Sequence, residues 1–103
     1  MAYTNPYTNG NIDLATIITT DADLALAKGQ KHGLAAITLS AASKTVTLGL
    51  GDGEYMRVLN AGGVNTFTLK NVAGDTGTSL AAGKYAVVIG STTADASIVK
   101  VLN

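Results

Sequence analysis

The chain has 103 residues, no cysteine, and seven basic and seven acidic side chains that cancel to a net charge of zero. This length allows one domain, and the missing cysteines exclude a disulfide framework, a thiolate metal site and a cysteine nucleophile. The balanced charge, without a run of basic residues, argues against binding to a nucleic-acid backbone.

The N-terminal stretch is polar and contains the single proline of the chain. We predict that residues 1–11 form an extended N-terminal arm, because this composition resists burial. The arm has no basic start followed by an apolar run, and nowhere in the chain do 18 apolar residues follow one another. We therefore expect neither a signal peptide nor a membrane span, and a chain that is made in a cytoplasm and stays soluble.

Residues 12–103 are expected to form a single β domain. Between Ile12 and Leu26 the alternation of Leu with Ala fits a strand, but the Ala and Leu content also permits one or two helical turns, so both readings stay open. After a turn at Lys28–Gly33, apolar residues recur with a period of two. This pattern predicts further strands in the segments AAITLS, KTVTLGL, YMRVLN, VNTFTLK, YAVVIG and SIVKVL.

Two short connections between these strands are typical of hairpins. The turn Ser40–Ser43 is short enough, and Asn60–Gly63 consists of residues that tolerate the positive φ of a hairpin turn. Asn71–Lys84 is expected to be a longer, glycine-rich loop of the kind that often carries function. Six or seven short strands with regular turns predict an all-β fold, a small antiparallel β-sandwich or barrel with an extended N-terminal arm.

Period two also assigns the side chains to faces. Phe67 and Leu69 are expected to point inward, while Lys70 and its neighbouring threonines point outward. Met56 and Val58 share one side of their strand. The core is expected to contain small and β-branched residues, because the chain has one Phe and no Trp.

Candidate chemistry is sparse. The single histidine, His32, lies in a turn without an obvious nucleophile and is interpreted as solvated. The segment Gly49–Glu54 is interpreted as a glycine-rich β-turn, because a phosphate-binding loop would open a helix and a strand follows here. Asp52 and Glu54 lack the run of oxygen ligands that a calcium loop supplies.

Asp21 and Asp23 fall on one face of a possible strand. Paired carboxylates could use such a geometry for catalysis, but a solvated strand edge is the commoner arrangement. We therefore predict that the protein is not an enzyme and has no catalytic, cofactor-binding or metal-binding residues.

The second half of the chain contains the hairpin-like pattern VLNAGGVNTFTLK, then SLAAGKYAVV and a final strand. In this pattern, residues 53–103 resemble small bacteriophage virion proteins, in particular capsid decoration, or head-stabilising, proteins. The resemblance implies a homotrimer of β domains that binds the outer capsid surface, bridges subunits of the major capsid protein and stabilises the expanded shell. Head-fibre and tail-fibre modules look similar, so a fibre base or receptor-binding module is the alternative.

Under this resemblance the arm is expected to touch the capsid, unless it is simply disordered. Tyr3, Pro6 and Tyr7 are the capsid-contact candidates, because ordering an arm on a partner requires apolar and aromatic contacts that offset the lost entropy. The expected partners are the major capsid protein and copies of the chain itself, with no nucleic acid and no membrane. The expected location is the outer surface of the virion, after synthesis in the host cytoplasm.

Overall fold

The computed structural model describes residues 15–26 and 33–103. In this part of the chain all regular structure is β-strand, which confirms the predicted all-β class, and no helix there could span a membrane. A five-stranded sheet contains, in spatial order, β1 (Ala15–Thr20), β3 (Leu34–Leu39), β5 (Tyr55–Asn60), β8 (Tyr85–Ile89) and β9 (Ile98–Leu102). A four-stranded sheet contains β2 (Leu24–Ala25), β4 (Lys44–Thr47), β6 (Phe67–Lys70) and β7 (Thr78–Leu80).

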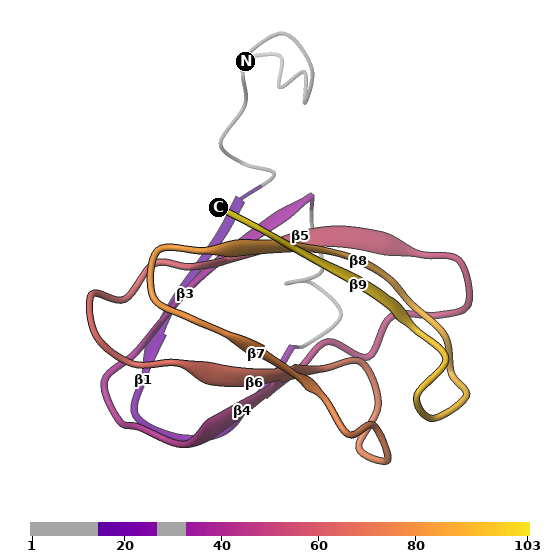
Figure 1. The fold of residues 1–103 in the computed structure, drawn as a ribbon, viewed down its shortest axis with the longest axis horizontal. Helices are drawn as coiled ribbons and strands as arrows, with labels where there is room; N and C mark the ends of the chain where they lie inside the picture. Colours follow the sequence, from indigo (N-terminus) through magenta and orange to yellow (C-terminus); the bar gives the residue numbers. More distant parts are fainter. Residues whose placement is uncertain (1–14, 27–32) are drawn as a thin grey trace, which may run out of the picture.

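The chain builds these sheets by passing back and forth between them (Figure 1). It runs from β1 to β2, from β3 to β4 and from β5 to β6, and each pass lies parallel to the one before. Thr16 lies opposite Ala35, which in turn lies opposite Val58. Equivalent residues therefore recur after roughly twenty positions, as in solenoids, where each unit contacts only its neighbours. Antiparallel pairing begins at the end of the stack, where β7, β8 and β9 join.

The prediction of wholly antiparallel sheets is therefore wrong, since both sheets are mixed, and neither sheet closes into a barrel. The hairpins predicted at Ser40–Ser43 and Asn60–Gly63 are also wrong, because the strands on either side of each turn lie in different sheets. Neither Gly62 nor Gly63 has the positive φ of a tight hairpin turn. Both connections are arches, in which the two flanking strands face each other through side chains instead of hydrogen-bonding.

A buried asparagine shapes the second arch. The Asn60 side-chain amide donates to the carbonyl oxygens of Asn65, at 2.8 Å, and Leu80, at 2.9 Å. Its Oδ1 accepts a hydrogen bond from the backbone N–H of Gly62 at 3.1 Å. Three backbone groups, one of them in β7, are thereby satisfied inside the protein, as burial requires. Asn60 thus holds the arch closed and connects it to β7.

Side chains from both sheets meet in one core, and the predicted faces are confirmed. Phe67, Leu69, Met56 and Val58 are all buried. The open question of strand or helix before Leu26 resolves to strand for the described residues, where β1 and β2 lie. The loop predicted at Asn71–Lys84 contains the short strand β7. The predicted arm, residues 1–11, lies outside the described residues.

Candidate functional site

The residues predicted from the sequence to contact a capsid, Tyr3, Pro6 and Tyr7, lie outside the described residues, as does His32. The described residues contain two other features that merit consideration as sites. One is a small hollow between two loops, and the other is the outer face of the five-stranded sheet.

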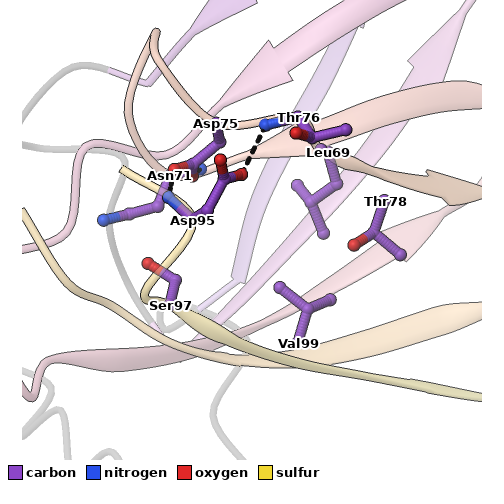
Figure 2. A pocket seen from close by; sticks show the side chains of 9 residues that line it. Leu69, Asn71, Asp75, Thr76, Thr78, Asp95, Ser97 and Val99 are labelled. Atoms are coloured by element: carbon purple, nitrogen blue, oxygen red, sulfur yellow. Dashed lines mark hydrogen bonds between the residues drawn. The ribbon is translucent and has the colours of Figure 1, made fainter. Parts of the chain in front are cut away.

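The hollow has a volume of about 170 Å³ and lies between the loop after β6 and the loop after β8. Figure 2 shows Asp75 and Asp95 close together at its polar end, away from Leu69 and Val99. The loop after β6 belongs to the four-stranded sheet and the loop after β8 to the five-stranded sheet. The hollow therefore marks the place where the two sheets are joined at one end.

Two aspartates make this joint by binding each other's loops. The Asp75 carboxylate accepts hydrogen bonds from the backbone N–H groups of Asn71 at 2.9 Å, Val72 at 3.1 Å and Asp95 at 2.7 Å. Asp95 Oδ1 accepts one in return from the backbone N–H of Thr76 at 2.7 Å. Asp95 has a φ of 58°, in the left-handed region that aspartate tolerates better than most residues. We name Asp75 and Asp95 the aspartate joint.

The electrostatics of the joint argue for a structural role. Burial is the largest single influence on Asp75 and by itself raises the pKa of the carboxyl group. The N–H donors of Asp95, Asn71 and Val72, together with the charge of Lys70, outweigh burial and hold the pKa below its ordinary value. Asp75 therefore carries its charge at neutral pH and does not supply a proton. Among the described residues no group of three or more acidic, histidine or cysteine side chains could hold a metal ion.

A buried asparagine beside the joint connects three parts of the chain. Asn71 Oδ1 accepts from the backbone N–H of Leu50 at 2.7 Å, and Nδ2 donates to the carbonyl oxygens of Leu50 at 3.0 Å and Ser91 at 2.9 Å. The turn before β5, the end of β6 and the loop after β8 are therefore held together by one side chain.

The carboxylates singled out in the sequence also hold turns. Asp52 accepts hydrogen bonds from the backbone N–H and the hydroxyl of Thr92, at 2.7 Å and 3.0 Å, and these bonds lower its pKa. Glu54 accepts from the backbone N–H of Gly51 at 2.6 Å. The strand β5 follows directly, so the interpretation of this segment as a glycine-rich turn is confirmed.

The other carboxylate pair, Asp21 and Asp23, does not lie on a strand face as expected. Both residues belong to the turn between β1 and β2. Asp23 Oδ1 accepts from the backbone N–H of Thr45 at 2.9 Å, which ties this turn to the start of β4. The turn ends the strand alternation before Asp21, and the Asp23 carboxylate serves there as the acceptor for the backbone N–H of Thr45.

The outer face of the five-stranded sheet is the second candidate. The pairing of β5, β8 and β9 aligns outward residues in three rows across the sheet. The rows consist of Tyr55, Ile89 and Ile98; Arg57, Val87 and Lys100; and Leu59, Tyr85 and Leu102. Leu34 and Ala36 on β3 continue the second and third rows. We name these outward residues the outer apolar face.

This face is apolar where a solvated sheet is normally polar. Tyr55 is 75% exposed, Ile98 62% and Ile89 41%. The outer face of the four-stranded sheet is polar by comparison and presents Thr45, Thr47, Thr68, Lys70 and Ser79. A sheet with one solvated side shows apolar residues on its inner side only, and contiguous exposed apolar patches mark interaction sites. The outer apolar face is therefore the candidate functional surface of the protein.

The sequence contains a signal for this surface, but the signal is not visible when only one alternating set of each strand is considered. In β8 both alternating sets are apolar, with Ala86 and Val88 inside and Tyr85, Val87 and Ile89 outside. A strand that is apolar on both sides is expected to be covered on both sides.

No protein-family model matches the sequence, and comparisons with curated proteins and with solved structures gave no match either.

Proposed function

We propose that the protein is a structural component of a bacteriophage virion, which binds the outer capsid surface as a homotrimer and stabilises the expanded shell. The observation that carries the proposal is the outer apolar face, where Tyr55 and Ile98 are largely exposed and burial against a partner is favourable. The resemblance of residues 53–103 to small virion proteins supports the major capsid protein as that partner. The body that presents the face is proposed to be a small β-sandwich, since both sheets contribute to one core.

The proposed mechanism is mass action without a chemical step. A protein that binds the expanded shell, but not the unexpanded one, lowers the free energy of the expanded state. At a free concentration one hundred times the Kd, each occupied site contributes about 2.7 kcal/mol. Three linked copies that engage neighbouring capsid subunits raise the effective concentration of one another, which strengthens the bridge.

The test uses expanded capsids assembled without this protein. Purified protein is added at increasing concentration, the capsids are sedimented, and bound protein is quantified by its ratio to the capsid subunit. We expect saturable binding and a higher temperature of capsid disruption, with a solution mass near three chains by light scattering. Failure to sediment with capsids at any concentration would refute the proposal. Binding to isolated tail or head fibres instead would favour the fibre alternative.

A further inference from the structure

The outer apolar face contains two cations in its middle row. Arg57 on β5 and Lys100 on β9 lie on either side of Val87, and both are exposed. One strand separates β5 from β9, so the backbones that carry the two cations lie about 9.5 Å apart. The outward residues of β3, β5, β8 and β9 include no acidic side chain.

These cations are not neutralised within the described part of the chain. No carboxylate among the described residues pairs with Arg57 or Lys100. The neighbouring Glu54 instead accepts the backbone N–H of Gly51. Burying the face against a purely apolar surface would strip water from two unpaired charges, which carries a desolvation penalty for each of them. An occupant that brings acceptors for both cations avoids this penalty and is therefore favoured.

A second copy of the same face does not meet this requirement. If two copies packed face to face about a two-fold axis along β8, Arg57 would oppose Lys100 of the second copy. If the axis ran across the strands through the middle row, Arg57 would oppose Arg57. Both arrangements bury like charges against each other, which is unfavourable in an interface.

We propose that the outer apolar face docks on a partner protein whose surface combines apolar side chains with two carboxylates, spaced to meet Arg57 and Lys100. Aromatic and aliphatic side chains of the two outer rows fill the partner's apolar surface, and the middle row supplies orientation and charge complementarity. This inference rests on the proposed function, in which the partner is the capsid, and it assigns the contact to the β body in addition to any contact that the N-terminal arm makes.

The experiment measures binding to expanded capsids assembled without the protein, at several salt concentrations. The test variants are Arg57→Glu and Lys100→Glu, which reverse the charges of the middle row. The matched control is Lys70→Glu, which makes the same change in net charge on the polar face of the other sheet. A further pair, Tyr3→Ala and Tyr7→Ala, tests the arm. Thermal unfolding of each variant verifies that the body remains folded.

Arg57→Glu and Lys100→Glu are each expected to weaken binding at least about tenfold, because each leaves a buried carboxylate opposed by a like charge. Lys70→Glu is expected to bind like the wild type, and wild-type binding should weaken with salt more steeply than that of the two test variants. If Arg57→Glu and Lys100→Glu both bind capsids as tightly as the wild type does, this inference is overturned and the proposed function is left standing. If only the arm variants lose binding, the contact lies in the arm. Absence of wild-type binding would overturn both proposals. A solution mass that falls on Arg57→Glu substitution would identify the face as a contact between copies and overturn the inference.

Discussion

Replacing Asn71 with alanine tests the network that joins the two sheets. The side chain is 2% exposed and makes three hydrogen bonds, one from the backbone N–H of Leu50 and two to the carbonyl oxygens of Leu50 and Ser91. Each such bond contributes about 1 kcal/mol net. Alanine leaves the buried N–H and carbonyl groups of Leu50 without this side-chain partner, whereas the Ser91 carbonyl oxygen keeps the hydroxyl of Ser97 at 3.3 Å. Asn71→Ala should therefore lower the free energy of unfolding by about 3 kcal/mol, or the Tm by roughly 10–20 °C.

Urea unfolding followed by far-UV circular dichroism measures this loss. The matched control is Asn65→Ala, since the half-buried Asn65 side chain makes a single hydrogen bond, to the carbonyl oxygen of Leu39 at 2.8 Å. That variant should lose about 1 kcal/mol. If Asn71→Ala lowers the free energy of unfolding by no more than Asn65→Ala does, the three hydrogen bonds of Asn71 do not hold the loops together and the reasoning is refuted.

Three further predictions concern single residues. The pKa of Asp75 is lowered in the fold from an ordinary value of 3.8, so its stabilising contribution is complete above that value and disappears as the pH falls through the lower folded pKa. Stability measured by urea titration should drop below about pH 4, and Asp75→Asn should flatten that drop. Gly90→Ala should cost about 1–3 kcal/mol in the same assay, because its Cβ would lie 2.5 Å from Leu50 Cβ, whereas Gly63→Ala, with nothing within 4 Å, should change stability by less than about 0.5 kcal/mol. Ser43→Gly should raise the free energy of unfolding by about 0.5 kcal/mol, and the Tm slightly, because Ser43 has a φ of 61° that glycine adopts without strain.

The assignment of side chains to faces could be predicted because alternation is a local property of a strand. Phe67 and Leu69 point inward, and Met56 and Val58 share the buried side of β5. In each case two residues separated by one position must lie on the same face, whatever the strand pairs with. The same argument predicted that Val99 and Val101 lie on the opposite face of β9 from Lys100.

The pairing of the strands could not be predicted in this way. A hairpin and an arch have the same alternation and the same short polar turn, and they differ only in whether the second strand joins the first in one sheet. At Asn60 the deciding factor is a buried amide that binds Leu80, 20 residues further along the chain. The hydrogen bonds donated by Thr92 to Asp52 and by Asp95 to Asp75 span 40 and 20 residues. No short motif contains both partners of such a contact.

The stacking of passes between the two sheets makes the body extensible. Each parallel pass hydrogen-bonds only with the pass before and the pass after it, so one more unit of roughly twenty residues would lengthen both sheets by a strand. The aspartate joint would remain unchanged, because it lies in the loops after β6 and β8. The middle row of the outer apolar face would also keep Arg57, Val87 and Lys100 together at the antiparallel end. Gene duplication within this fold can therefore alter the breadth of the protein along a bound surface while its docking chemistry stays the same.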